Sequence, residues 1–242
     1  MSEDRVREPG TEGDSRYLDR FGLLLSVTVA SVVMLSLVDV DRPLGEVAAQ
    51  VGPVVTTILV GATLLLALRA SGVSRRWWLA GVVVVALILA SNLMLSLVQA
   101  LSDVPTNRYS ATAPPAALVV LAALAPAIVV RRLLQHRSVT TGTLQGAIAA
   151  YLLIPVAYFY LFQAVDTYQL TPFFGQPESS PAFMYFSLST LTTLGYGDIG
   201  AVTDLGRLLA TSEAIVGQIY LVTFVAMIVG LLAGRRAPSP PT

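Results

Sequence analysis

The chain contains no cysteine, which excludes disulfide bonds and metal sites with thiolate ligands. Its single histidine, His136, excludes a site built from paired histidines and is expected to be a solvated linker residue. Charged residues are scarce, at 12% of 242 residues against 55% apolar residues. This composition excludes a soluble domain, and several apolar runs approach or exceed the ~20 residues that cross a bilayer. The sequence therefore predicts an all-α polytopic membrane protein without a cofactor, a catalytic site or a nucleic-acid partner.

Apolar runs bounded by polar or charged residues predict six transmembrane helices. Residues 1–20 are expected to form a disordered cytoplasmic N-terminus, and residues 237–242 a short cytoplasmic tail. The basic residues 131–137 are expected to form a short amphipathic helix along the membrane surface. Asn92 is expected to make an interhelical hydrogen bond, and no internal repeat indicates an inverted-repeat transporter. The six predicted spans cover approximately residues 21–38, 47–68, 77–101, 113–130, 141–165 and 205–233.

An even number of spans places both termini on one side of the membrane, and the arginines indicate which side. Arg42, Arg108 and Arg207 fall on one face, and the other arginines fall on the face that carries the termini. The positive-inside rule makes this second face cytoplasmic. Because every basic residue except the histidine is arginine, we expect a GC-rich bacterium and a bacterial plasma membrane. The predicted outer face collects carboxylates that would concentrate cations: Asp39, Asp41, Glu46, Asp103, Asp166, Glu178, Asp198 and Asp204.

Residues 181–198, PAFMYFSLSTLTTLGYGD, combine a short apolar helix with a glycine-containing segment. Ser180 is a candidate N-cap, and Pro181 suits the first helical position. As a helix, residues 181–192 rise about 18 Å, which is only part of the ~30 Å hydrocarbon core. Irregular backbone at that depth survives when it is buried in protein or lines a watery cavity. The stretch therefore predicts a re-entrant pore helix followed by a loop.

Residues 193–197 have the properties of a segment that binds a dehydrated cation. Such a site needs rings of carbonyl oxygens that replace the water shell of the ion. Stacking successive carbonyls on one side requires left-handed conformations, which glycine adopts without steric cost, and Gly195 and Gly197 alternate. The Thr193 hydroxyl adds a further oxygen. One segment supplies one side of each ring, so a closed pore requires several copies of the chain.

The run Thr193-Leu194-Gly195-Tyr196-Gly197 closely resembles the selectivity filter of potassium channels, with leucine where valine or isoleucine is more usual. Residues 184–198 also resemble the pore helix that leads into that filter. The resemblance implies a homotetramer in which K⁺ binds the backbone carbonyls of Thr193, Leu194, Gly195 and Tyr196, with the Thr193 hydroxyl as a further ligand. It divides the chain into a four-helix domain, residues 21–137, in the position of a voltage sensor, and a pore domain, residues 138–236. Within the pore domain the outer helix is 141–165, the pore helix 181–192, the filter 193–197 and the inner helix 205–233.

The same resemblance indicates residues that would support the filter. Gly197 completes it, and Asp198 matches an aspartate that the aromatic at the position of Tyr185 braces; the alternative is a solvated carboxylate. Glu213 lies within the last span, where ionisable residues are functional by default. It either supports the filter by accepting hydrogen bonds from Ser or Thr hydroxyls, or reaches water or Arg207.

The last span also contains candidate residues for a gate. Gly217 matches a hinge glycine of the family, or is a close-packing position. Helical spacing places Gln218, Leu221, Val225 and Val229 on one stripe. If the stripe faces the pore axis, Val225 and Val229 form a narrow apolar gate that closes by dewetting. The alternative is that the stripe contacts the fifth span.

These features together predict a potassium-selective channel subunit that conducts K⁺ passively and is not an enzyme. A weakly selective cation channel or a regulatory pore subunit is the nearer alternative, and a secondary transporter is the more distant one. Voltage-gated relatives carry a basic residue at every third position of the fourth span, whereas residues 111–130 contain no charge. The channel is therefore expected to be voltage-insensitive.

Overall fold

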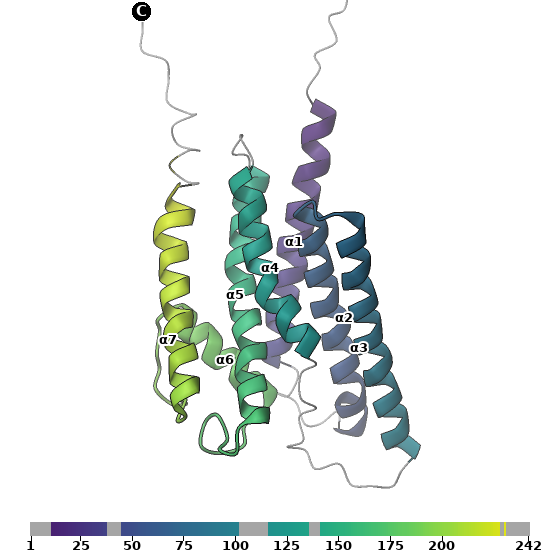
Figure 1. Ribbon diagram of the computed structural model, residues 1–242, viewed down its shortest axis with the longest axis vertical. Coiled ribbons are helices and arrows are strands. Elements are labelled where there is room, and N and C mark those ends of the chain that lie inside the picture. The colour runs from purple at the N-terminus through teal and green to yellow at the C-terminus, as the bar shows by residue number, and fades with distance from the viewer. Residues whose placement is uncertain (1–10, 38–44, 102–115, 136–140, 228–229, 231–242) are drawn as a thin grey trace, which may run out of the picture.

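The computed structural model describes residues 11–37, 45–101, 116–135, 141–227 and 230 (Figure 1). Within these ranges the chain forms helices joined by turns and loops, and no strand. In chain order the elements are α1 (Thr11–Leu37), α2 (Gly45–Ala70), α3 (Arg75–Leu101), α4 (Ala116–Gln135), α5 (Thr141–Tyr168), α6 (Ser180–Leu191), α7 (Asp204–Ile219) and the π-helix η2 (Tyr220–Val225). His136 lies outside the described residues.

Three of the described helices are long and apolar enough to cross a membrane. These segments are Arg75–Met94 in α3, Ala116–Leu134 in α4 and Gly142–Tyr168 in α5. Shorter apolar segments, Phe21–Leu37 and Thr57–Ala70, occur in α1 and α2. The described part of the chain thus agrees with an all-helical membrane protein, and the exact number of six spans stays a prediction.

Two helix ends differ from the sequence prediction. Residues 11–20 are not disordered but form the start of α1, whose first turn carries Glu12 and Asp14. Residues 131–135 do not form a separate surface helix but continue α4. Arginine, leucine and glutamine are strong helix formers, so nothing there ends the helix.

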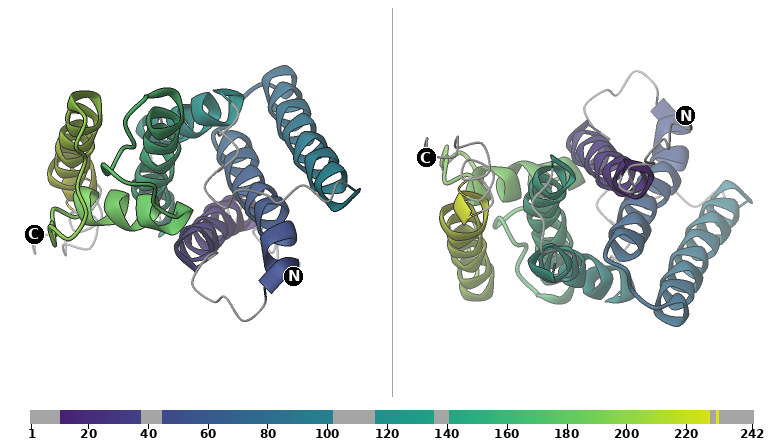
Figure 2. Two further views of the ribbon diagram at one scale, coloured as in Figure 1. Left: turned by 90° about the horizontal axis from the view of Figure 1, so that it is seen from below. Right: turned by 90° about the horizontal axis from the view of Figure 1, so that it is seen from above.

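Helix α5 occupies the centre of the molecule. It contacts α1 and α4 on one side and α6 and α7 on the other. Helix α2 packs against α1, α3 and α4, so α3 lies at one edge of the molecule and α7 at the opposite edge (Figure 2). The four N-terminal helices and the C-terminal part of the chain are therefore joined mainly through α5, with a direct contact between α1 and α6.

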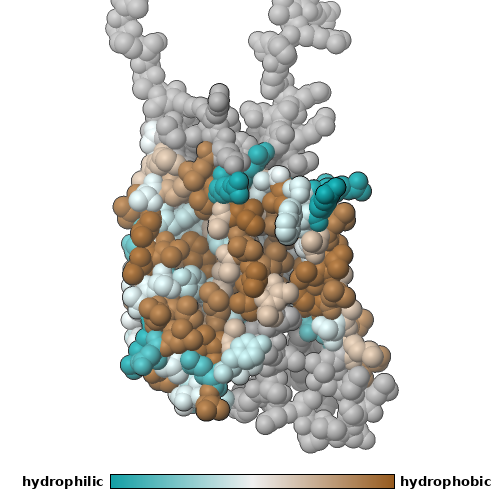
Figure 3. Space-filling view, in the orientation of Figure 1, coloured by the Kyte–Doolittle hydropathy of each residue, from teal (hydrophilic) through white to brown (hydrophobic). Residues whose placement is uncertain are grey.

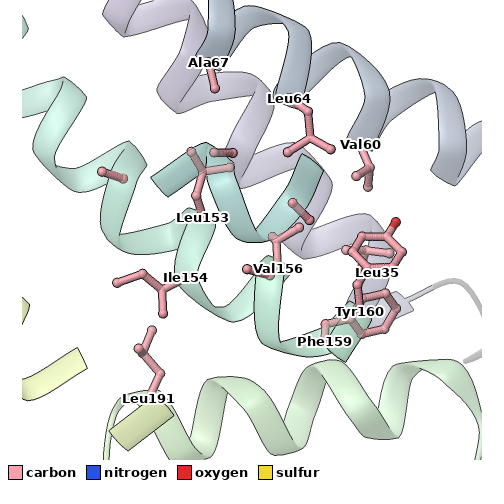
Figure 4. Packing of buried hydrophobic residues seen from close by; sticks show 14 of the residues in the cluster. Leu35, Val60, Leu64, Ala67, Leu153, Ile154, Val156, Phe159, Tyr160 and Leu191 are labelled. Carbon is pink, nitrogen blue, oxygen red and sulfur yellow. The ribbon is translucent and has the colours of Figure 1, made fainter. Parts of the chain in front are cut away.

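The buried core of the N-terminal helices lies between α1, α2, α4 and α5. Close-packed aliphatic and aromatic side chains of α1, α2 and α5 point towards one another there, and Leu191 at the end of α6 points towards Ile154 of α5 (Figure 4). Leu191 thereby ties the deep end of α6 to the central helix. The labelled core residues are Leu35, Val60, Leu64, Ala67, Leu153, Ile154, Val156, Phe159, Tyr160 and Leu191.

Polar and small residues bring neighbouring helices close together. The hydroxyls of Ser31 in α1 and Thr63 in α2 lie 2.6 Å apart. The predicted interhelical hydrogen bond of Asn92 is confirmed, because its Nδ2 donates to Thr57 Oγ1 at 2.9 Å. A Cβ at Gly146 of α5 would lie 2.9 Å from side-chain atoms of α1 and α4. Such contacts replace the hydrophobic driving force that is missing between helices in lipid.

The two ends of the molecule differ in charge. The α2–α3 turn and the C-terminal end of α4 lie at the upper end in Figure 1, and they carry Arg69, Arg75, Arg76, Arg131 and Arg132. The α5–α6 loop and the start of α7 lie at the lower end. Hydrophobic side chains cover the middle of the face shown in Figure 3, and hydrophilic ones gather towards its ends. This distribution suits a protein that spans a bilayer from end to end.

Candidate functional site

Helix α6 is a short helix that ends part of the way along the bundle, where its last residue, Leu191, is buried. It begins at Ser180 with proline in its first turn, and it continues for 12 residues. Its N-cap is Ser179, not Ser180 as predicted, and Ser179 makes no side-chain capping bond. The Ser180 hydroxyl instead accepts a hydrogen bond from Gln163 Nε2 of α5 at 2.7 Å. The chain after α6 returns to the end at which α6 began, which is the predicted re-entrant path (Figure 1).

An aromatic cluster fixes α6 from behind. Phe173 and Phe174 of the α5–α6 loop pack against Phe183 and Phe186 of α6, with ring centroids 4.8 to 5.9 Å apart. Phe162 of α5 joins them, at 4.9 Å from the Phe173 ring and 5.3 Å from the Phe186 ring. These rings are buried, so the loop serves as a wall behind the helix.

Two hydrogen bonds hold the backbone of that loop. Asp166 Oδ1 accepts from the Phe173 amide at 2.7 Å, and the Phe173 carbonyl accepts from the Val202 amide at 3.0 Å. The second bond connects the segment before α6 to the segment after residues 193–197. Both ends of the re-entrant part are therefore fastened to the same loop.

Residues 193, 195 and 197 have left-handed backbone conformations. Their φ angles are 57° at Thr193, 56° at Gly195 and 78° at Gly197. The predicted left-handed glycines are therefore confirmed, and Thr193 is the one non-glycine residue with positive φ among the described residues. A threonine in this region carries a steric cost that only a well-fixed structure maintains.

The carbonyl oxygens of residues 193–197 are free of hydrogen bonds. Within the described part of the chain no donor contacts them, whereas the Leu194 amide donates back to the Ser189 carbonyl of α6 at 2.9 Å. The Thr193 hydroxyl donates to the Thr192 carbonyl at 2.7 Å, and its oxygen keeps lone pairs for another partner. Leu194 and Tyr196 are 57% and 66% exposed, so the segment lies on an open side of the chain.

Tyr185 and Asp198 make the predicted contact across this segment. The Tyr185 hydroxyl donates to Asp198 Oδ2 at 2.8 Å, so the carboxylate is bonded to α6 and not merely solvated. The Tyr185 ring also stacks on Tyr196, with centroids 5.8 Å apart and planes at 10°. One tyrosine of α6 therefore contacts two residues of the segment.

Glu213 of α7 is fully buried behind α6. Its Oε1 accepts a hydrogen bond from the Ser187 hydroxyl at 2.5 Å, which is the predicted kind of contact. Arg207 is not its partner, because the Arg207 Nε donates to the Ala201 carbonyl at 3.1 Å. The Ser187 oxygen also lies 3.0 Å from the carbonyl oxygen of Pro155, so one serine connects α5, α6 and α7. Nothing in the sequence distinguishes Ser187 from the other hydroxyl residues of α6, because only the packing brings Glu213 to it.

Gly217 is a close-packing position. A Cβ there would lie 2.6 Å from Leu191 Cδ1 and 3.0 Å from the Leu191 carbonyl oxygen at the end of α6. Helix α7 can approach α6 only with glycine at this point. The hinge role of Gly217 stays a prediction.

The predicted stripe of α7 and η2 is described in part. Gln218 and Leu221 are exposed, so they do not form a buried contact with α5. The side chain of Val225 and all of Val229 lie outside the described residues. Contact with α5 comes instead from Tyr220, whose hydroxyl donates to the Ala147 carbonyl at 2.8 Å.

The π-helix η2 is not predicted by the sequence pattern. Its wider turn begins at Tyr220, directly after α7, and the Thr223 hydroxyl bonds the Ile219 carbonyl. Isolated π-helical turns occur frequently at functional sites. Threonine hydroxyls often bond the carbonyl four residues earlier in ordinary α-helices, so Thr223 does not by itself indicate a π-helix.

Replacing Ser187 tests the buried contact with Glu213. Ser187→Ala removes the hydroxyl and leaves the buried carboxyl without its described partner, so we expect a loss of about 1–3 kcal/mol in the free energy of unfolding. The measurement is the thermal midpoint of the purified protein in detergent. Removing both polar groups together, in Ser187→Ala with Glu213→Leu, should restore part of the loss.

The control is Ser189→Ala on the same helix. The Ser189 hydroxyl bonds only the Phe186 carbonyl of its own helix, at 3.1 Å, so its midpoint should stay near that of the unchanged protein. Equal midpoints for the two single variants would contradict a special role of Ser187.

Residues 147–233 match a protein-family model described as an ion channel. Searches of curated proteins and of solved structures found no match. The matched range begins within α5 and contains α6, residues 193–197, α7 and η2, which is the complete site described above. The family is one of channels and not of enzymes. The C-terminal part of the chain is therefore similar to an ion-channel domain, which supports an ion-channel function.

Proposed function

We propose that the chain is one subunit of a potassium-selective channel in which four copies surround a central pore. The observation that carries this proposal is the backbone of residues 193–197. Left-handed residues alternate along it, and its carbonyl oxygens have no donor in the described part of the chain. Rings of carbonyl oxygens are what replace the hydration shell of K⁺ in a filter. Thr193, Leu194, Gly195 and Tyr196 would supply these oxygens from each subunit.

The exposed side of α7 supports assembly from several copies. Within the described residues α7 packs against α5 and α6 on one side and continues into η2. Its other sides expose Leu208, Ile215, Ile219 and, in η2, Val222. The open filter segment lies beside this apolar surface. A homotetramer in a lipid bilayer would cover both and close the carbonyl rings.

Two contacts would hold the filter in position. Tyr185 and Asp198 brace its outer part, and Glu213 holds α6 through Ser187. Since α6 ends in the interior, the negative end of its helix dipole would favour a cation in a cavity below the filter. Gln218, Leu221, Val225 and Val229 would line the pore farther along and form an apolar gate.

The charge distribution supports an orientation. The described arginines of the α2–α3 turn and of α4 lie at the end opposite to the α5–α6 loop and the start of α7 (Figure 1). By the positive-inside rule that end is cytoplasmic. The proposed protein then has six spans with both termini in the cytoplasm, in a bacterial plasma membrane.

The experiment that tests this function is a measurement of ion selectivity in liposomes. Purified protein under a K⁺/Na⁺ gradient should give a reversal potential that follows K⁺, because the carbonyl rings replace the water shell of that ion. Equal permeability to both ions would contradict selectivity and favour a weakly selective cation channel. Absence of any flux from correctly assembled protein would favour a regulatory subunit.

A substitution of Gly195 tests whether residues 193–197 are the filter. Gly195→Ala places a Cβ in a left-handed conformation, at a cost of about 1–2 kcal/mol in each chain. We expect the variant to assemble and to lose K⁺ flux. The control is Gly200→Ala, because a Cβ at Gly200 meets nothing within 4 Å and the residue has no positive φ. Normal flux through assembled Gly195→Ala would show that ions follow another path.

The voltage dependence of conductance should be shallow. Moving one charge across the membrane supplies about 2.3 kcal/mol per 100 mV, and steep gating needs several such charges in each subunit. Helix α4 carries Arg131 and Arg132 only near its C-terminal end, after an uncharged apolar segment. We expect an effective gating charge of about two or fewer per tetramer in symmetric K⁺. A steep sigmoidal conductance curve, or gating currents before opening, would refute this.

A further inference from the structure

The α2–α3 turn and the C-terminal end of α4 form a basic cluster. It consists of Arg69, Arg75, Arg76, Arg131 and Arg132. The sequence contains no Asp or Glu between residues 47 and 102 or between 116 and 135, so the only carboxylate on the three helices that carry the cluster is Glu46, in the first turn of α2 and far along the helix from Arg69. The described residues form no ion pair with it. A concentration of cations of this kind attracts anions.

Arg132 has a special position within this basic cluster. Its Nε is buried and has no hydrogen-bond partner in the described part of the chain. A buried donor without a partner is rare in folded proteins, and each case requires an explanation such as an absent ligand. The other members of the cluster have no such buried nitrogen in the described structure.

The α2–α3 turn leaves room for the Arg132 side chain. Gly72 in this turn has φ of +67°, and the turn is closed by the Gly72 amide donating to the Arg69 carbonyl at 3.2 Å. A Cβ at Gly72 would lie 3.3 Å from the guanidinium carbon of Arg132. The guanidinium group of α4 therefore lies directly on the turn between α2 and α3, and α3 begins there at Arg75. The positive end of the α3 dipole adds to the attraction for an anion.

We propose that Arg132 and the α2–α3 turn bind the phosphate group of an anionic phospholipid. A guanidinium group offers several N–H donors in a planar fork that matches phosphate oxygens. A phosphate here would give the buried Nε its acceptor and would neutralise part of the cluster. Basic pockets between transmembrane helices are suited to anionic lipid headgroups for this reason.

The surroundings of the basic cluster favour a lipid over a free anion. Trp77 is 73% exposed next to it, and the Arg69 guanidinium lies 5.7 Å from the centre of the Trp78 ring. Tryptophans are typical of the headgroup level of a membrane. Exposed aliphatic side chains lie farther from the basic end on α3 and α4, including Leu79, Val83 and Leu124. A phospholipid would therefore place its phosphate on Arg132 and its acyl chains along these helices.

Arg131 and Arg132 form a matched pair for the test. Both are arginines at the same end of α4, but Arg131 is exposed and has no buried nitrogen. Arg132→Gln and Arg131→Gln remove the same charge, so diffuse attraction to a negative bilayer would weaken equally in both. A specific phosphate site would be lost only in Arg132→Gln. Arg132→Lys keeps the charge without the fork and serves as a second variant if Arg132→Gln does not fold.

The experiment counts lipids bound to the purified, folded protein by native mass spectrometry. The probes are phosphatidylglycerol, phosphatidylcholine and inorganic phosphate, each titrated against the unchanged protein and the three variants. We expect a saturable preference for phosphatidylglycerol in the unchanged protein and in Arg131→Gln. The apparent affinity should fall about tenfold in Arg132→Gln, as loss of one charge-assisted interaction implies, and should fall in Arg132→Lys as well.

Three results would overturn the proposal. Equal losses in the Arg131 and Arg132 variants would show diffuse attraction. Equal binding of phosphatidylglycerol and phosphatidylcholine would show that the charge of the headgroup has no role, and saturation by inorganic phosphate alone would show a free-anion site. Because lipids are counted without ion flux, the outcome is independent of the proposed channel function.

Discussion

The non-helical backbone of residues 193–197 must be held in position part of the way along a bundle of apolar helices. The rest of the structure depends on this constraint. Residues 193–197 have three left-handed residues, one of which is a threonine, and their carbonyl oxygens have no donor within the described ranges of the chain. Such a segment has no regular hydrogen-bond ladder to fix it. Its conformation therefore comes from α6 and from the contacts that fix α6.

Those contacts surround α6 on the sides away from the open face. The phenylalanines of the α5–α6 loop pack behind it, Leu191 fixes its deep end, and Ser187 binds both Glu213 and the α5 backbone. Gly217 lets α7 approach the last turn of α6 to van der Waals distance. Apolar packing thus fixes the position of α6, while a few hydrogen bonds fix its rotation and register. A hydroxyl group of α6 bonds one oxygen of the buried Glu213 carboxyl, while the other, Oε2, has no partner among the described residues.

The two halves of the chain have different relations to their surroundings. Helices α1 and α4 pack against α5, and α2 packs against α1 and α4, whereas α7 is covered on one side and exposes apolar residues on the others. Beyond Gly217 the helix widens into η2, where Tyr220 anchors it to α5. The chain therefore fixes the side of α7 that faces α5 and α6. The other sides of α7 and the carbonyl oxygens of residues 193–197 stay accessible for contacts with another molecule or with ions.

The sequence by itself determined the local features. Apolar runs gave the helices to within a few residues over most of the described chain, because burial in lipid requires continuous apolar helix. The spacing of Gly195 and Gly197 indicated left-handed backbone, and Asn92 indicated an interhelical hydrogen bond. The contact between Tyr185 and Asp198 was also predicted, from a resemblance that covers both residues. Each of these depends on a residue's own conformational or bonding preferences, or on a short stretch of chain.

Only the tertiary structure decided the contacts between residues far apart in the chain. Ser187 is the partner of Glu213 because α5, α6 and α7 meet at one point, and 26 residues separate the two side chains. The same packing places the guanidinium group of Arg132 against Gly72 and the Leu191 side chain against Gly217. The π-helix after α7 escaped prediction because its sequence is compatible with an α-helix, and its wider turn coincides with the anchoring of Tyr220 to α5. Such features depend on relative helix positions, which are set by the sum of many contacts and not by any short stretch of sequence.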